Sequence, residues 1–201
     1  MESKTVYFEN TGKENTEATL RIAKQRAEEL GIKTILVAST TGYAAVKAIE
    51  ILEGFRVIVV THSTGFKEPD VQEFTEENKK IVESKGGIIL TTTHAFGGLN
   101  RAMRQSSIPE APATYVIGDI VATTLRIICQ GMKVTCEIAA MAADAGLVRT
   151  DEDVIAVAGT GTGNAGRGAD TAVVLQPAHT HLFFQLAVRE ILCKPLYPHR
   201  Y

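Results

Sequence analysis

Short apolar runs alternate with helical patterns through the first half of the chain. The helical segments repeat apolar residues every three or four positions, whereas the apolar runs are continuous, as in strands buried on both faces of a sheet. Predicted strands are 5–8, 34–38, 56–60 and 88–90, and predicted helices are 16–30, 43–52 and about 74–84. This alternation predicts an α/β fold with a mainly parallel sheet and right-handed crossovers.

The second half of the chain has a different pattern. Three segments rich in Ala, Ile and Thr predict helices that pack close to the sheet, at 96–104, 119–129 and 133–145. Two more strands are predicted at 154–158 and 171–175. The stretch HTHLFFQLAVREILCKP predicts an apolar C-terminal helix that ends at Pro195. No linker interrupts the pattern, so residues 1–201 are predicted to form a single domain.

A glycine-rich stretch, GTGTGNAGRGAD, separates the last two predicted strands. Gly161, Gly163 and Gly166 satisfy the G-x-G-x-x-G pattern of dinucleotide-binding folds. That fingerprint needs a helix after the loop to hold the pyrophosphate, but the following residues are β-branched and predict a strand. Two interpretations stay open. The stretch is either a hairpin loop without a ligand or a loop whose backbone N–H groups approach an anion, with Arg167 as a candidate counter-charge.

Composition narrows the class of protein. The formal net charge is only -2 and no block of Lys or Arg occurs, which argues against a surface for nucleic acid or an anionic membrane. The three cysteines have no metal-site spacing and are expected to be buried. The N-terminal residues lack the pattern of a signal peptide, and no apolar run is long enough to span a membrane. We therefore expect a cytoplasmic protein.

Small hydroxyl, amide and glycine residues follow every predicted strand of the parallel sheet. Such loops share the carboxyl edge of a sheet, where helix N-termini leave N–H groups unpaired, although any one of them also suits plain helix capping. The candidates are Asn10, Thr11 and Thr16, then Ser39, Thr40, Thr41 and Gly42, then Thr61, His62 and Ser63, then Thr91, His94 and Phe96, and finally Gly159, Thr160, Gly161, Thr162 and Gly163. Together they predict a pocket for a group with about two negative charges, since each helix N-terminus presents roughly half a positive charge.

Candidate catalytic chemistry is sparse. His62 and His94 each follow a strand and are candidates for an acid, a base or a hydrogen-bond donor, with a structural loop role equally open. Phe66 and Phe96 are placed to cover a flat ring, although isolated aromatic residues more often belong to a core. His179 and His181 have a metal-like spacing without a carboxylate cluster, so no metal site is predicted.

Two stretches resemble the C-terminal α/β domain of pyruvate kinase. The segment TILVASTTGYAAVKAIEILEGFRVIVVTH is similar to the start of that domain, and AADAGLVRTDEDVIAVAGTGTGNAGRGADTAVVLQPA is similar to its closing section. The resemblance implies a three-layer α/β/α sandwich with a mostly parallel sheet, a five-stranded core and a final antiparallel strand. The region from about 95 to 131 would then be a helical insertion.

The resemblance also has functional implications. In some pyruvate kinases this domain binds a phosphorylated allosteric sugar at its Thr/Ser-Gly turn, which would make Ser39, Thr40, Thr41 and Gly42 phosphate contacts here. No pyruvate kinase activity is expected, because the barrel that holds the active site is missing from the sequence. A group of stand-alone archaeal proteins similar to this domain is associated with bound flavin mononucleotide (FMN).

Three functions follow as hypotheses. The first is binding of a phosphorylated flat cofactor, FMN foremost, which would make the protein an oxidoreductase if the flavin turned over. The second is a non-catalytic regulatory module for a sugar phosphate or a nucleotide. The third is a structural subunit whose apolar C-terminal helix, residues 182–192, packs against a copy of itself, giving a homo-oligomer, or against a partner.

Overall fold

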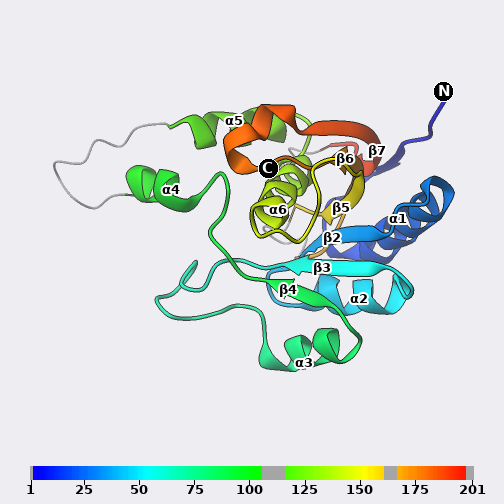
Figure 1. The fold of residues 1–201 in the computed structure, drawn as a ribbon, viewed down its shortest axis with the longest axis horizontal. Helices are drawn as coiled ribbons and strands as arrows, with labels where there is room; N and C mark the ends of the chain where they lie inside the picture. The colour runs from blue at the N-terminus through cyan, green and yellow to red at the C-terminus, as the bar shows by residue number, and fades with distance from the viewer. Residues whose placement is uncertain (1, 106–115, 161–166, 198–201) are drawn as a thin grey trace.

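A seven-stranded sheet runs through the middle of the molecule (Figure 1). The computed structural model describes residues 2–105, 116–160 and 167–197. The strands are β1 (Val6–Phe8), β2 (Thr34–Ala38), β3 (Arg56–Val60), β4 (Ile88–Leu90), β5 (Val154–Ala158), β6 (Thr171–Gln176) and β7 (Ala187–Pro195). They are ordered β1-β7-β6-β5-β2-β3-β4.

One strand of the described sheet, β6, runs against its neighbours. It is antiparallel to both β5 and β7, whereas β5, β2, β3 and β4 form a parallel series and β1 is parallel to β7. The carboxyl ends of β1 to β5 therefore lie at one edge of the sheet, together with the start of β6. This confirms the predicted mostly parallel sheet and places the predicted polar loops at a common edge.

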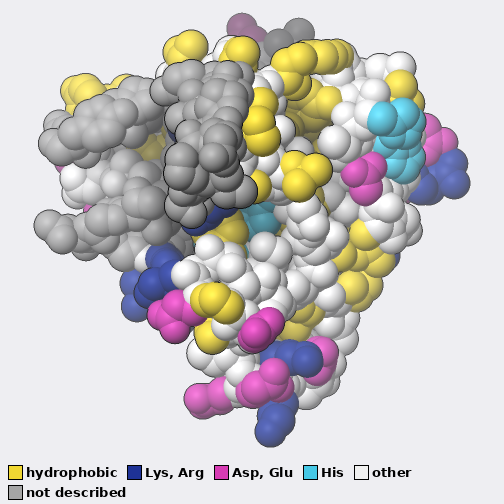
Figure 2. Space-filling view, turned by 90° about the vertical axis from the view of Figure 1, so that its left-hand side faces the viewer, with side chains coloured by type: hydrophobic (Ala, Val, Ile, Leu, Met, Phe, Trp, Pro, Cys, Tyr) yellow, Lys and Arg dark blue, Asp and Glu magenta, His cyan; other side chains and the backbone are white. Residues whose placement is uncertain are grey.

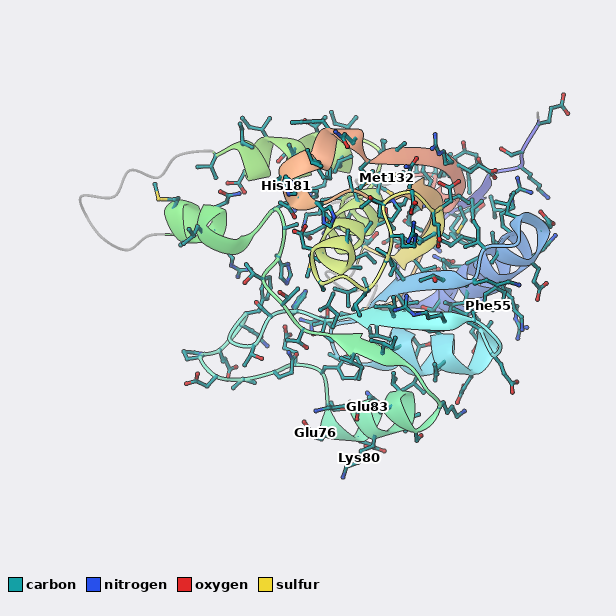
Figure 3. The ribbon with its side chains drawn as sticks, viewed as in Figure 1. Phe55, Glu76, Lys80, Glu83, Met132 and His181 are labelled. Carbon is teal, nitrogen blue, oxygen red and sulfur yellow. The ribbon has the colours of Figure 1, made fainter. Side chains whose placement is uncertain are left out.

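Helices cover both faces of the sheet. They are α1 (Thr16–Leu30), α2 (Tyr43–Ile51), α3 (Glu76–Ser84), α4 (Gly98–Gln105), α5 (Ile117–Arg126) and α6 (Gln130–Asp144), with 3-10 turns η1 (Lys13–Asn15) and η3 (Thr180–Gln185). The first three pack on one face, and α5 and α6 lie on the other. Glu76, Lys80 and Glu83 of α3 point away from the sheet (Figure 3), as expected for the solvent side of an amphipathic helix.

The two cores follow from the alternation of side chains along the strands. Ile35 and Val37 of β2 face α1 and α2, while Leu36 faces α6, and β5 divides its side chains in the same way. Both faces are therefore apolar, which is why the central strands read as continuous apolar runs. Residues 131–143 of α6 are buried almost throughout, because this helix lies between the sheet and α5.

The predicted C-terminal helix is wrong. Residues 180–185 form the η3 turn, and Ala187–Pro195 form strand β7 between β1 and β6. The apolar residues in this tail have helical spacing, but the segment forms a strand because it pairs with β1 and β6. Such tertiary pairing is not visible in a local sequence pattern. The homo-oligomer predicted through that helix loses its basis. The resemblance implied that the sheet ends in an antiparallel strand. Strand β6 is antiparallel to β5, but it is not the last strand, because the chain continues into β7, which pairs with β6.

A buried carboxylate joins the loops at the β1 side of the sheet. Asp170 accepts hydrogen bonds from the backbone N–H groups of Gly12 (2.9 Å) and Thr160 (3.1 Å) and from the hydroxyls of Thr160 and Thr171. These partners belong to the loop after β1, the loop after β5 and the start of β6. One side chain therefore ties the loop after β1 to both ends of the β5–β6 connection, 158 residues further along the chain.

We expect Asp170→Ala to lower the free energy of unfolding by about 3 kcal/mol, because it leaves the buried Gly12 N–H and the partly buried Thr160 N–H without an acceptor. Urea unfolding measures this. Asp151→Ala is the matched control, since its side chain is 64% exposed and pairs with Arg149 at the surface, and we expect it to cost about 0.5 kcal/mol. Equal losses in the two variants would show that the Asp170 contacts are not what holds these loops.

Candidate functional site

A cavity of about 370 Å³ opens at the carboxyl edge of the sheet. Its described walls come from the loops after β2, β3, β4 and β5 and from helices α5 and α6. In the surface view of this side, histidine and basic side chains are visible in a hollow beside the undescribed segments (Figure 2). The position agrees with the rule that ligands of open parallel sheets bind beyond the carboxyl ends of the strands.

The structure brings half of the predicted site residues together. Those that line the cavity are Ser39, Thr40, Thr41, Thr61, His62, His94, Phe96, Gly159 and Thr160, joined by Arg167. The predicted residues that are not part of its lining are Asn10, Thr11, Thr16, Gly42, Ser63 and Thr91. Gly161, Thr162 and Gly163 lie outside the described residues.

The Ser-Thr-Thr-Gly turn forms the entry to helix α2. Ser39 Oγ accepts the Ala45 N–H at 3.3 Å, so this hydroxyl has a structural role. Gly42 adopts φ 105°, and a Cβ there would clash with Cβ of Asn78, whose side-chain amide donates to the Thr41 carbonyl. The turn is therefore fixed from behind by α3, while Thr40 and Thr41 line the cavity.

The loop after β1 packs against the start of β6. Thr16 is fully buried; its hydroxyl donates to the Lys13 carbonyl at 2.8 Å and accepts the Ala169 N–H at 3.1 Å. Gly12 is held by Asp170 as described above. The contacts of Gly12 and Thr16 are therefore structural, and neither residue is part of the cavity lining.

The described ends of the glycine loop explain two of its glycines without a ligand. A Cβ on Gly159 would lie 2.0 Å from the Gly168 carbonyl oxygen, and one on Gly168 would lie 2.5 Å from Cα of Lys13. Both distances are far inside van der Waals contact. These glycines are needed because segments of the chain itself approach each other there.

A chain of polar contacts crosses the mouth of the cavity. Arg167 pairs with Glu73 at 2.7 Å, Glu73 contacts His62 Nδ1 at 2.8 Å, and His62 Nε2 lies 3.4 Å from the Thr40 hydroxyl. Burial opposes ionisation of Glu73, but the hydrogen bonds from Arg167 and His62 outweigh burial and lower the pKa of this carboxyl. Arg167 is thereby held beside the α2 entry.

Aromatic rings stack beside this chain. The Phe66 ring lies 4.8 Å from that of His94 at an interplanar angle of 15° and 4.1 Å from that of His62. The Arg101 guanidinium lies 3.9 Å from the Phe66 centroid. Phe96 instead packs edge-on against Phe183 within the core on the α6 face, although it also contributes to the cavity wall. Phe66 therefore belongs to an aromatic stack in the cavity wall, with His94 and Arg101 against its ring.

Sequence reasoning missed the charged wall supplied by the helices. Lys133 and Glu137 of α6 form an ion pair, with side chains only 11% and 3% exposed, and Glu137 Oε1 accepts the Phe96 N–H at 3.1 Å. Asp119 and Arg126 of α5 also line the cavity. The available signal was a Lys and a Glu four residues apart on an otherwise apolar, Ala-rich helix, where charges are costly unless they are paired.

His94 connects the stacked rings to this wall. Its Nδ1 lies 3.9 Å from Glu137 Oε2, and its Nε2 is shielded from water with no hydrogen-bond partner among the described residues. Burial lowers the pKa of His94 to about 4, although the Glu137 carboxylate opposes that shift. The imidazole is therefore neutral at pH 7.

Comparison with known proteins identifies the family. The model of the pyruvate kinase alpha/beta domain matches residues 17–175. The chain belongs to this family. Among solved structures, pyruvate kinase from Cryptosporidium parvum in complex with ADP matches 86% of this chain at 14% identity and a TM-score of 0.36. The chain covers 23% of that protein's length.

The family assignment confirms the resemblance seen in the sequence. The match to the pyruvate kinase domain extends from within α1 almost to the end of β6, a span that includes the cavity walls. Within the described ranges, no helix is long and apolar enough to cross a membrane. The same ranges hold no cluster of three His, Cys, Asp or Glu side chains suited to a metal ion, and His179 instead lies 3.2 Å from Asp144.

We expect Glu73→Gln to lower the free energy of unfolding at pH 7 by about 1 to 2 kcal/mol, because it weakens two charge-assisted contacts. The folded pKa of Glu73 is below its ordinary value of 4.5. Its contribution is therefore present above that value and is lost as the pH falls through the folded pKa. Urea unfolding at pH 7 and in acid measures the difference between wild type and variant, which should shrink in acid.

The control for this variant is Glu53→Gln, an exposed carboxylate that is not part of the cavity lining. It should change stability by less than about 0.5 kcal/mol at either pH. A Glu73→Gln difference that stays constant into acid would mean that the carboxylate charge is not the source of the effect.

Proposed function

We propose that the protein binds a small phosphorylated molecule with a flat ring in the carboxyl-edge cavity, and that FMN is this ligand. The observation that carries the proposal is the charge of the cavity wall. Arg101, Arg126, Lys133 and Arg167 line the cavity together with Asp119 and Glu137. With Glu73, which pairs with Arg167, four cations against three carboxylates leave a net positive charge among these described residues, which suits a phosphomonoester with about two negative charges at neutral pH.

The phosphate would bind at the α2 entry. Thr40 and Thr41 line the cavity where α2 begins, and Arg167 is held nearby through Glu73 and His62. A helix N-terminus supplies N–H groups and a partial positive charge, and Arg adds a bidentate donor. The turn is already fixed by Asn78 and Ser39, so little ordering is needed on binding.

The ring would lie against the α6 wall, beside the stacked rings of Phe66 and His94. The cavity volume agrees with this placement, because about 370 Å³ lies within the usual range of small-molecule sites, roughly 300 to 1,000 Å³. Phe66 and His94 supply an aromatic wall, and Lys133 and His94 supply polar groups beside the apolar side chains of Ala122, Val134 and Ile138. A bound flavin would supply electron-transfer chemistry, and the chain's own part would be to hold the ring and exclude water from it.

A regulatory module for a sugar phosphate or nucleotide is the second candidate. The excess of cations along the cavity would suit those phosphates equally well, and the family to which the chain belongs is that of a pyruvate kinase domain. The aromatic and imidazole faces favour FMN over a sugar, because sugars offer no flat ring to stack on.

The visible absorption spectrum of the purified protein separates the two candidates, when it is repeated on the supernatant after acid denaturation. We expect flavin bands in the released chromophore or, for protein purified without ligand, saturable quenching of FMN fluorescence on titration. A colourless protein that does not quench FMN but binds a sugar phosphate in calorimetry would replace FMN with the regulatory function.

We expect Thr41→Glu to weaken FMN binding at least tenfold, about 1.4 kcal/mol, because it places a negative charge where the phosphate would bind. Fluorescence titration measures the dissociation constant. Thr150→Glu adds the same charge before β5, at the opposite edge of the sheet, and should leave FMN affinity unchanged. An unchanged affinity in Thr41→Glu would remove the phosphate from the α2 entry.

A further inference from the structure

His94 is the most unusual side chain of the cavity, because its two ring nitrogens have different surroundings. Nδ1 faces the Glu137 carboxylate at 3.9 Å, while Nε2 is buried without a hydrogen-bond partner among the described residues. A buried polar atom left unpaired costs about 1 to 3 kcal/mol. His94 lines the cavity, so a ligand donor that displaces the side chains around Nε2 would satisfy this nitrogen.

The neighbourhood of His94 determines which kind of partner fits. The negative charge of Glu137 favours a proton on Nδ1, the nitrogen that faces it, and a neutral imidazole carries only one proton. Nε2 is then left with a lone pair, which accepts hydrogen bonds. A complementary ligand atom must therefore be an N–H or O–H donor.

Lys133 adds a donor next to this acceptor. Its ammonium contacts the same Glu137 oxygen that lies 3.9 Å from His94, so the two side chains converge on one carboxylate. An ammonium group presents several N–H donors around one nitrogen. The wall thus holds an acceptor and a donor on two side chains that contact the same carboxylate oxygen, and this pair complements a ring edge where an N–H stands beside a carbonyl.

We propose that His94 and Lys133 recognise a cyclic imide edge of the ligand's ring, with His94 Nε2 accepting the imide N–H and Lys133 donating to a neighbouring carbonyl oxygen. This inference rests on the proposed function and specifies the ligand class. Flavins and uridine-type nucleotides are phosphorylated rings that carry such an edge. Rings with an amino group at that edge, such as cytosine, do not match it.

Paired ligands that differ only at the imide test this directly. Dissociation constants are measured for FMN and its N3-methyl derivative, and for uridine and cytidine monophosphate. We expect the wild-type protein to bind FMN at least about tenfold more tightly than the N-methyl derivative, because methylation removes the donor and leaves Nε2 unpaired. If uridine monophosphate binds more tightly than cytidine monophosphate and FMN does not bind, the imide inference holds with a nucleotide as its source.

Two variants separate recognition from steric exclusion. His94→Leu removes the acceptor and should bind the two flavins with a ratio near one, whereas His94→Gln can place a side-chain oxygen near the former Nε2 and should retain much of the preference. Thermal unfolding confirms that each variant is folded. The ratio is compared within each variant, so a general loss of affinity does not affect it.

The outcomes distinguish the two proposals. Tight FMN binding with no preference over the N-methyl derivative would overturn the imide inference and leave the proposed function intact. A preference that survives in His94→Leu would also overturn it, since the selectivity would then come from elsewhere. Failure of all four ligands to bind the wild type would overturn the proposed function and this inference with it.

Discussion

The buried charge of Glu137 is the constraint on which the candidate site depends. This carboxylate lies on α6, a helix otherwise packed between the sheet and α5, and contacts Lys133, His94 and the Phe96 backbone. Buried ion pairs contribute little net stability, since apolar residues of similar volume often serve as well or better. The cost of burying these charges is therefore better explained by what they do at the cavity wall than by the fold.

The cavity has two sides with different polar groups. On one side, the α2 entry and the Arg167–Glu73–His62 contacts hold the donors that we propose for a phosphate. On the other, Glu137 positions a neutral imidazole and an ammonium. Phe66 stacks on the imidazole and lies between the two sides. A ligand with a phosphate at one end and a polar ring edge at the other would satisfy both.

Most of the fold could be predicted from local pattern. The bounds of α1, β2, β3, β4 and β5 agree with prediction, because apolar periodicity and signals such as Gly31 at the α1 C-cap are local. The β7 strand could not be predicted in this way, because its conformation comes from pairing with β1 and β6. A helical spacing of apolar residues does not predict a helix reliably where the segment can pair with a strand on each side.

The candidate site could be predicted only in part, for a related physical reason. Residues such as Thr41 and His62 come directly after strands, so topology alone brings them to the edge. Lys133 and Glu137 reach the cavity from the middle of a helix, where the packing of α6 against the sheet decides which face is turned inward. Thr16 shows the opposite case, because its hydroxyl has the right position in the sequence but bonds to Lys13 and Ala169 instead.

The most direct measurement is a crystal structure of the protein grown with FMN. We expect density for the phosphate against Thr41 and Arg167, with the ring beside Phe66 and its polar edge at His94 and Lys133. An empty cavity at saturating FMN, or flavin bound at another surface, would contradict a ligand site at this edge of the sheet.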